Sequence, residues 1–176
     1  MPTPERTSLA EIVRAGQELL EDGGPARLTM QSVAERVGVR APSLYKRVRD
    51  RDALLAAVVA ATLDDLTGRL AASDRSLEGL ARAYRAFAHD RPEGFRLLFA
   101  SAPPQDALDR SSAAILGSAR ELVGDEHALE AARLVTAWAT GFVQMELAGA
   151  FRLGGDLDDA FAFGLATLRR GLAATP

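Results

Sequence analysis

The stretch that decides the fold is LTMQSVAERVGVRAPSLYKRVRDR, which runs from Leu28 to Arg51. Thr29 is a suitable N-cap, because its hydroxyl can accept a hydrogen bond from a free backbone N–H at the start of a helix. The apolar residues that follow recur at helical spacing and give that helix one buried face: Met30, Val33, Ala34 and Val37. The stretch therefore begins with a short amphipathic helix.

A tight turn and a second helix are predicted next. Gly38 can enter a left-handed turn without steric strain. Arg40 to Val48 then reads as a helix that accepts Pro42 in its first turn. A small residue at Ala34 lets two helices cross closely, and Leu44 can pin the second helix to the first. This spacing predicts a helix-turn-helix.

The outward face of the second helix carries donors suited to base edges and phosphate oxygens in a major groove. They are Arg40, Ser43, Tyr45, Lys46 and Arg47. The alternative is an ordinary helical hairpin with a solvated basic face, but turn chemistry, core spacing and basic face coincide here. Arg51 follows the helix cap Asp50, where an arginine opposes the helix dipole. This position favours a phosphate ligand, and the alternative is a solvated arginine. The full predicted DNA-binding set is Thr29, Gln31, Arg40, Ala41, Pro42, Ser43, Tyr45, Lys46, Arg47 and Arg51.

The segment resembles the DNA-binding part of the tetracycline-repressor (TetR) family of transcriptional regulators. The shared pattern is leucine-threonine, a short helix ending in glycine-valine, then serine-leucine-tyrosine, and it extends over about residues 8 to 60. Downstream, RPEGFRLLF and TAWATGFVQMELAGAF are similar to a C-terminal regulatory domain of the Trp-His-Gly type found in part of that family. Here Trp138 is followed by Ala139, Thr140 and Gly141, which departs from that type. The resemblance implies a DNA-backbone contact at Arg51 and an effector held in the regulatory domain.

Composition favours an all-α protein. The 176 residues are 48% hydrophobic, and no stretch shows the alternation or β-branched runs of strands. Cysteine is absent, which fits a reducing cytosol. The longest apolar run, Ala53 to Leu63, is too short to cross a membrane, and MPTPERTSL carries no apolar signal segment. We therefore expect a cytoplasmic protein with no membrane partner.

The distribution of charge favours a nucleic-acid partner although the net charge is −3. Between residues 36 and 51 the only acidic residue is Asp50, against the basic residues Arg36, Arg40, Lys46, Arg47, Arg49 and Arg51. In residues 53 to 176 the acidic residues outnumber the arginines. A basic patch on an acidic body leaves one face competent to bind phosphate.

The sequence predicts two parts. Residues 1–52 form a helix-turn-helix DNA-binding domain of three helices, whose first helix is capped by Ser8 and ends at the Gly23-Gly24-Pro25 stretch, behind the polar arm Met1 to Thr7. Residues 53–176 form a helical-bundle domain for ligand binding and dimerisation. The helices predicted after the helix-turn-helix cover residues 50–70, 77–88, 92–99, 106–123, 127–151 and 157–172.

Aromatic side chains in the second part suggest an effector cavity. Set on helices that a bundle would bring together, they would line an apolar pocket, although plain core is the more frequent role of any one of them. The resemblance supports the pocket, because family members usually hold an effector there. The predicted ligand-binding residues are Tyr84, Phe87, Phe95, Phe99, Trp138, Phe142 and Met145. Tyr84 and Gln144 could orient the small apolar effector.

The last two long helices carry more apolar positions than one buried face requires, which predicts a homodimer built from a four-helix interface. Its candidate residues are Leu147, Phe151, Phe161 and Leu168. The sequence offers no metal-ligand spacing, cofactor loop or nucleophile elbow, so we expect no catalytic residue, no metal and no cofactor.

The sequence therefore predicts a ligand-responsive dimeric repressor of a palindromic double-stranded DNA operator. The alternatives are a constitutive or architectural DNA-binding dimer without an effector, and, further off, an enzyme on a helical scaffold.

Overall fold

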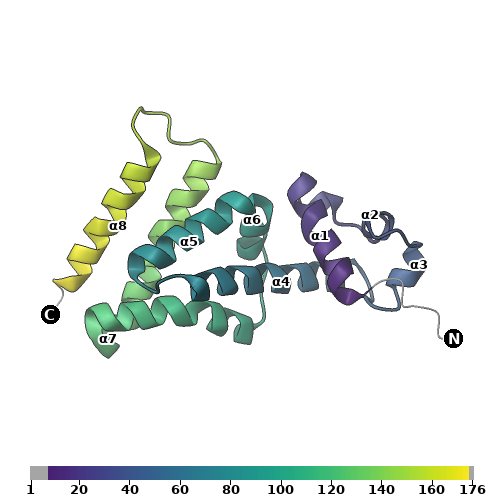
Figure 1. Ribbon diagram of the computed structural model, residues 1–176, viewed down its shortest axis with the longest axis horizontal. Coiled ribbons are helices and arrows are strands. Elements are labelled where there is room, and N and C mark those ends of the chain that lie inside the picture. Colours follow the sequence, from purple (N-terminus) through teal and green to yellow (C-terminus); the bar gives the residue numbers. More distant parts are fainter. Residues whose placement is uncertain (1–7, 175–176) are drawn as a thin grey trace. The chain divides into compact units, whose positions relative to one another are not determined.

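The computed structural model describes residues 8–174, which form helices and no strand (Figure 1). The predicted polar arm, residues 1–7, lies outside the described residues. In chain order the elements are α1 (Leu9–Gly23), the 3₁₀ turn η1 (Pro25–Arg27), α2 (Met30–Arg36), α3 (Ala41–Leu44), α4 (Arg51–Ala72), α5 (Leu77–Asp90), α6 (Pro92–Ala100), α7 (Gln105–Leu147) and α8 (Leu157–Ala173). The predicted all-α class is confirmed.

Local sequence signals set most helix ends as predicted. Ser8 caps α1 in a capping box, in which Glu11 N donates to Ser8 Oγ and Ser8 N donates to the Glu11 carboxylate. Gly24, with φ 73°, ends that helix. At the start of α4 the amide of Ala53 donates to Asp50 Oδ1 at 2.8 Å, which confirms Asp50 as its cap.

Two helices end before their predicted ends, and a third predicted boundary is retained as a kink. Regular helix in α3 covers only Ala41–Leu44, and the chain stays wound to Val48 through bonds from the Arg47 and Val48 amides to the Leu44 carbonyl. The long element α7 runs through Gly124, but that residue has non-helical φ 79° and ψ 175°, so two helices meet there at the predicted break. The second of them ends at Leu147, because Gly149 turns left-handed, which leaves Phe151 outside the helix.

The chain divides into two compact units. Unit 1 contains residues up to Asp65 together with Arg91–Leu108, and unit 2 contains Leu66–Asp90 and the chain from Asp109 onward. The unit that holds the helix-turn-helix thus also takes in the first part of α4 and all of α6. The boundary after residue 52 stays a prediction about where the DNA-binding domain ends.

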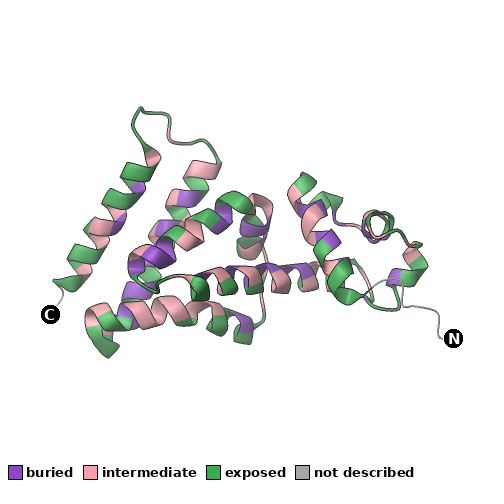
Figure 2. Ribbon diagram, viewed as in Figure 1, coloured by how far each residue is buried: buried purple, intermediate pink, exposed green. Residues whose placement is uncertain are grey.

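The core of unit 1 joins the helix-turn-helix to α1, α4 and α6. Its buried residues are Ile12, Ala15, Leu19, Leu20, Leu28, Met30, Val33, Ala34, Leu44, Val48, Leu54, Val58, Val59 and Leu97. Gly16 is required where α1 crosses α4, because a Cβ there would lie 2.7 Å from Val58 Cγ2. Buried positions recur along one side of the helices in Figure 2.

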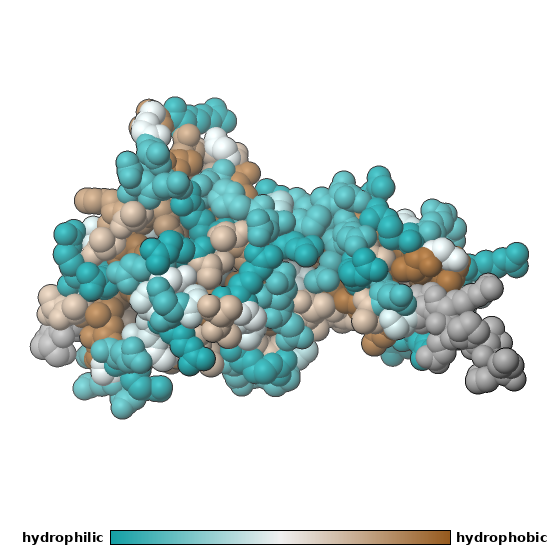
Figure 3. Space-filling view, in the orientation of Figure 1, coloured by the Kyte–Doolittle hydropathy of each residue, from teal (hydrophilic) through white to brown (hydrophobic). Residues whose placement is uncertain are grey.

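Unit 2 has its own packed interior. Ala119, Ala131 and Ala132 are buried against Ile115, Leu116, Val123 and Leu172, so the two parts of α7 pack on each other and on α8. Phe87 is fully buried, and the Arg69 guanidinium lies 5.4 Å from its ring centroid. Hydrophilic residues cover most of the visible face in Figure 3.

Candidate DNA-binding surface and effector region

The helix-turn-helix is held by a polar cap on one side and an apolar contact on the other. Ser32 N donates to Thr29 Oγ1 at 3.0 Å, which starts α2. Gly38 has φ 72°, and the amide of Val39 donates to the Ala34 carbonyl at 2.9 Å. Ala34 and Leu44 are 1% and 0% exposed, and both belong to the core of unit 1, against which α2 and α3 pack. The predicted helix-turn-helix is confirmed.

The structure places most of the predicted DNA-binding residues in and around α3 on the surface. Arg40, Pro42, Ser43, Tyr45, Lys46 and Arg47 are exposed, and Ala41 is half-buried. The ring of Tyr45 is notable, because this aromatic residue is 54% exposed next to a fully buried Leu44. An exposed aromatic with a hydroxyl suits contact with a sugar-phosphate backbone.

The other predicted residues have neighbours within the chain. The Gln31 amide donates to Glu35 Oε1 at 2.6 Å, on the exposed side of α2. Arg51 donates from Nε to the Leu28 carbonyl at 2.9 Å and from Nη2 to the Pro25 carbonyl at 2.8 Å. The Arg51 guanidinium is thus hydrogen-bonded to two backbone carbonyls.

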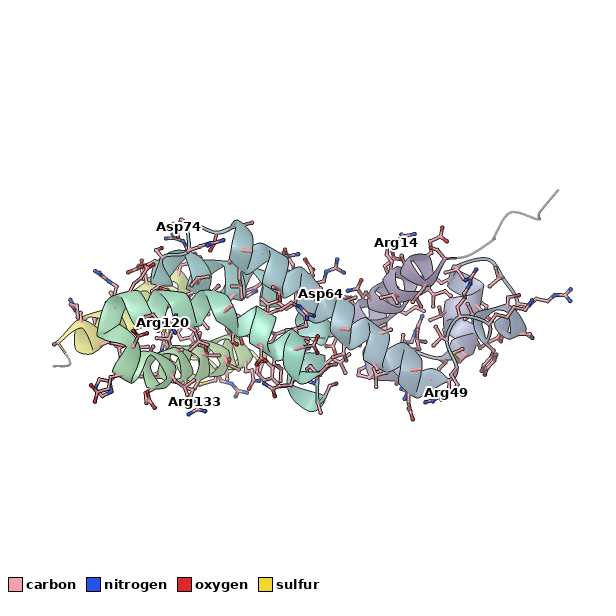
Figure 4. The ribbon with its side chains drawn as sticks, turned by 90° about the horizontal axis from the view of Figure 1, so that it is seen from below. Arg14, Arg49, Asp64, Asp74, Arg120 and Arg133 are labelled. Atoms are coloured by element: carbon pink, nitrogen blue, oxygen red, sulfur yellow. The ribbon has the colours of Figure 1, made fainter. Side chains whose placement is uncertain are left out.

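Two basic residues of the predicted patch are neutralised inside the chain. Arg36 pairs with Glu18 at 3.1 Å and with Asp22 at 2.6 Å, which braces α2 against α1. Arg49 pairs with Asp50 at 2.7 Å. The hydrogen bond from the Ala53 amide, with help from Arg49, lowers the pKa of the Asp50 carboxyl. In Figure 4 the labelled Arg49 side chain projects outward at the N-terminal end of α4.

In unit 2 the predicted pocket and dimer residues share one aromatic cluster. Trp138 stacks on Phe161 with ring centroids 5.0 Å apart, and Phe142 lies 5.1 Å from Phe161 and 4.8 Å from Phe151. Phe161, predicted for the dimer interface, is 3% exposed and packs within its own chain against Trp138 and Phe142. The cluster fastens the second part of α7 to α8.

The remaining predicted ligand residues are dispersed. Phe95 and Phe99 belong to unit 1, where their rings meet edge to face at 5.2 Å, whereas Tyr84, Phe87 and Met145 belong to unit 2. Met145 and Phe99 are 47% and 52% exposed. Gln144, expected to orient a ligand, is also exposed.

A polar network between α5 and α7 was missed by sequence reasoning. Tyr84 Oη and Thr140 Oγ1 lie 2.7 Å apart, and burial raises the pKa of Tyr84 to about 12. The next residue on α5, Arg85, donates to both oxygens of Glu146 on α7, at 2.9 and 2.5 Å. One sequence signal could have indicated this pair. Glu146 is the first acidic residue after Arg133 on α7, so it is a lone carboxylate within an apolar run.

Arg85 and Glu146 have further neighbours. Arg85 Nη1 pairs with Asp158 of α8 at 2.7 Å, and its guanidinium lies 5.0 Å from the Phe161 ring centroid. His89 Nε2 lies 3.1 Å from Glu146 Oε2. The hydrogen bonds from Arg85 hold the pKa of the Glu146 carboxyl below its usual range. The network therefore ties α5 to both α7 and α8.

Two other kinds of site have no candidate within residues 8–174. Neither a group of three or more His, Asp or Glu side chains placed to hold a metal ion nor a helix long and apolar enough to span a bilayer occurs there.

Exposed donors lie in and around the short helix α3, which follows the turn at Gly38 and has Leu44 buried in the core. This arrangement is typical of a DNA-binding transcriptional regulator of the helix-turn-helix class. Comparison with known families gives the same result. Residues 5–58 match the bacterial regulatory proteins of the tetR family, and residues 77–168 match the tetracyclin repressor-like C-terminal domain. The chain belongs to the tetracycline-repressor family.

Individual relatives agree with this assignment. An uncharacterized HTH-type transcriptional regulator of Mycobacterium tuberculosis is 29% identical over 83% of this chain and 73% of the relative. The class A tetracycline repressor from transposon 1721 of Escherichia coli is 32% identical over 78% of this chain and 66% of that repressor. The crystal structure of a TetR variant from Acinetobacter baumannii in complex with minocycline is 26% identical, with TM-score 0.69 over 94% of this chain and 96% of that chain. These relatives are regulators rather than enzymes.

Proposed function

We propose that this regulator is a cytoplasmic repressor that binds a palindromic operator as a homodimer and leaves it when a small apolar effector binds in unit 2. The DNA-binding part of this proposal rests on the exposed donors in and around α3, whose Leu44 is buried in the core of unit 1. Arg40 and Ser43 face the bases in this proposal, and Tyr45 and Lys46 meet phosphates. Pro42 and Ala41 lie between these residues and form the surface at which α3 approaches the DNA closely.

A dimer is supported by the apolar surface of α7 and α8. One helix-turn-helix domain, called a head below, covers too little DNA for tight specific binding, so two heads about 34 Å apart are expected on a pseudo-palindrome. Phe163 is 71% exposed and lies on the opposite side of α8 from the buried Phe161. Leu134 and Met145, eleven residues apart and so on one face of α7, are both 47% exposed. We assign the dimer surface to these three residues. Leu147 and Leu168, also predicted for the interface, are half-buried, and helical spacing places them away from Met145 and Phe163.

An effector site is supported by two observations of different kinds. The Acinetobacter relative, which has this fold, crystallised in complex with minocycline. In this chain the Tyr84–Thr140 pair supplies a half-buried hydroxyl couple between α5 and α7, and Phe87, three residues after Tyr84 on α5, is fully buried. Thr140 lies in the segment that resembles the Trp-His-Gly type, and we propose that its hydroxyl and that of Tyr84 orient the effector.

A constitutive DNA-binding dimer is the second candidate. It is favoured by the packing of Trp138 and Phe142 against Phe161, which fills part of the region predicted as a pocket. Such a protein would bind its operator equally well with every compound, because a ligand that does not discriminate between two states shifts neither.

The test begins with duplexes selected from a random-sequence library by the full-length protein, followed by titration at several salt concentrations. Lys46→Ala should weaken binding to every duplex and lower the salt slope by about one per head. Tyr45→Phe should weaken binding less, through one lost hydroxyl contact. Unchanged affinity and slope in both variants would contradict the assignment of these residues to phosphates.

Effector release is measured with a labelled selected duplex and a panel of apolar compounds that includes minocycline. Release of DNA by a compound supports the repressor. Retention of DNA with every compound, combined with normal operator binding, favours the constitutive dimer. Trp138 is the only tryptophan of the chain, so its fluorescence reports independently whether a compound reaches the α7–α8 cluster.

A further inference from the structure

Arg51 makes two contacts that a phosphate ligand would not need. Its Nε donates to the carbonyl of Leu28, and its Nη2 donates to the carbonyl of Pro25, 23 and 26 residues earlier in the chain. We propose that Arg51 is a positioning residue, which holds the start of α2 in its DNA-binding geometry. This role rests on the proposed DNA-binding function.

The two carbonyls belong to the segment that comes directly before α2. Pro25 opens the 3₁₀ turn η1, and its carbonyl also accepts from the Leu28 amide at 3.3 Å. Leu28 comes directly before the cap Thr29, and its side chain is fully buried in the core of unit 1. Fixing the Leu28 carbonyl therefore fixes the peptide plane from which Thr29 begins.

The Ser32 and Val33 amides at the start of α2 donate to Thr29, whereas the Leu28 carbonyl accepts from Arg51. Ser32 N donates to the Thr29 hydroxyl and Val33 N donates to the Thr29 carbonyl, both at 3.0 Å. A carbonyl beside a buried residue needs a donor, and a charged donor gives a stronger bond than a neutral one. Arg51 supplies that donor from the first turn of α4.

The geometry requires arginine rather than any positive charge. A guanidinium presents Nε–H and Nη–H in a fixed planar fork, so one side chain can reach two carbonyls at 2.9 and 2.8 Å. A lysine ammonium is a single point at the end of a flexible stem. Lysine would keep the charge at this position but lose the bridge.

The bridge has a direct consequence for DNA binding. It joins the first residue of α4, whose cap is Asp50, to the residue before the cap of α2. Thr29 and Gln31, both in the predicted DNA-binding set, follow Leu28 within three residues. A phosphate role and a positioning role therefore make different predictions about charge and about the protein without DNA.

The experiment compares full-length wild type, Arg51→Ala, Arg51→Lys and a control, Arg49→Ala. The control removes a charge two residues away that pairs with Asp50. Two quantities are measured: amide hydrogen exchange at Leu28, Thr29 and Ser32 without DNA, and affinity with its salt slope on a library-selected duplex.

We expect faster exchange at these amides in Arg51→Ala and Arg51→Lys, but not in Arg49→Ala. Both Arg51 variants should bind the duplex about tenfold more weakly, because each loses hydrogen bonds to a charged donor, with the salt slope of the wild type. Restored affinity in Arg51→Lys, with a slope lowered by about one per head in Arg51→Ala only, would establish a phosphate ligand and overturn the proposal.

Wild-type exchange rates in both Arg51 variants would also overturn it, even if their DNA binding were weak. Failure of the wild-type protein to select any duplex would instead refute the proposed DNA-binding function. In that case the exchange measurement, which needs no DNA, still decides whether Arg51 holds the start of α2.

Discussion

Arg85 and Glu146 form a bidentate ion pair that joins α5 to α7, with N–O distances of 2.9 and 2.5 Å. The Arg85 and Glu146 side chains are 17% and 8% exposed, so the pair is largely withdrawn from water. A buried pair contributes little net stability compared with an apolar replacement, but removing one partner leaves the other uncompensated.

Glu146→Gln should lower the free energy of unfolding at neutral pH by about 2 kcal/mol, because within residues 8–174 Arg85 would be left with the exposed Asp158 as its charged partner. Urea unfolding measures this change. Glu130→Gln, at an exposed position of the same helix, is the matched control and should change stability by less than about 0.5 kcal/mol.

The same carboxylate should make stability depend on pH. The pKa of Glu146 is lowered in the folded protein, so the unfolded chain binds its proton first as the pH falls. Its contribution is complete above the ordinary glutamate pKa of about 4.3 and is lost as the pH falls below that value. Unfolding free energies measured between pH 7 and pH 3 should therefore fall less steeply in Glu146→Gln than in the wild type. Parallel curves would show that the pair does not perturb this carboxyl.

A second prediction concerns the contact between Gly164 and Trp138. A Cβ on Gly164 would lie 2.4 Å from Trp138 Cζ2, so Gly164→Ala must push the indole out of its stack on Phe161. We expect a loss of about 1–3 kcal/mol despite the better helix propensity of alanine, together with a shift in Trp138 fluorescence.

Gly117→Ala provides the comparison for this change, because a Cβ there meets nothing within 4 Å. It should raise stability by about 0.5–1 kcal/mol through helix propensity alone. Equal effects of the two substitutions would show that the indole yields without strain.

The third prediction concerns a helix cap supplied from a distant part of the chain. Glu21 of α1 accepts from the amides of Glu93 and Gly94 at 3.1 and 2.9 Å, at the start of α6, where Arg91 makes no side-chain cap bond. Glu21→Ala should speed amide exchange at residues 93 and 94 and cost about 1 kcal/mol. Glu121→Ala, an exposed change on α7, should affect neither quantity. If exchange at 93 and 94 stayed at the wild-type rate, the cap would be dispensable.

Local signals explain why much of the fold could be predicted from sequence. Thr29, Gly38 and Leu44 act within a few residues of each other, so the chemistry that makes the turn is legible in one short stretch. The same holds for the cap at Asp50 and for the break at Gly124. The predictions of helix ends were less accurate. At α3, for example, hydrogen-bonded turns replace regular helix after Leu44.

Two important contacts that sequence reasoning missed join distant segments. Arg85 and Glu146 lie 61 residues apart, and Glu21 and Gly94 lie 73 apart, so neither pair leaves a spacing pattern in the sequence. Aromatic residues were found as a group, but periodicity alone does not tell a ring packed on the next helix from one facing a cavity or a second subunit. Phe161 shows this limit, because its helix has apolar residues on both sides.

The last prediction tests the dimer surface through Phe163. This ring is 71% exposed on the side of α8 that faces away from Phe161 and Leu165, which are both 3% exposed. If two copies pair through α7 and α8, a glutamate at this position places a charge in an apolar interface, where it is strongly unfavourable. Phe163→Glu should therefore give a folded monomer at micromolar concentration, as measured by light scattering.

The loss of the dimer should also weaken DNA binding, because a single head is left to contact one half-site. Leu153→Glu is the matched control, since Leu153 is an apolar residue that is 92% exposed in the connection before α8. It should remain dimeric and bind the selected duplex as the wild type does. A dimeric Phe163→Glu with normal helix content and normal DNA affinity would show that the copies pair through another face, or that Phe163 lies outside the contact.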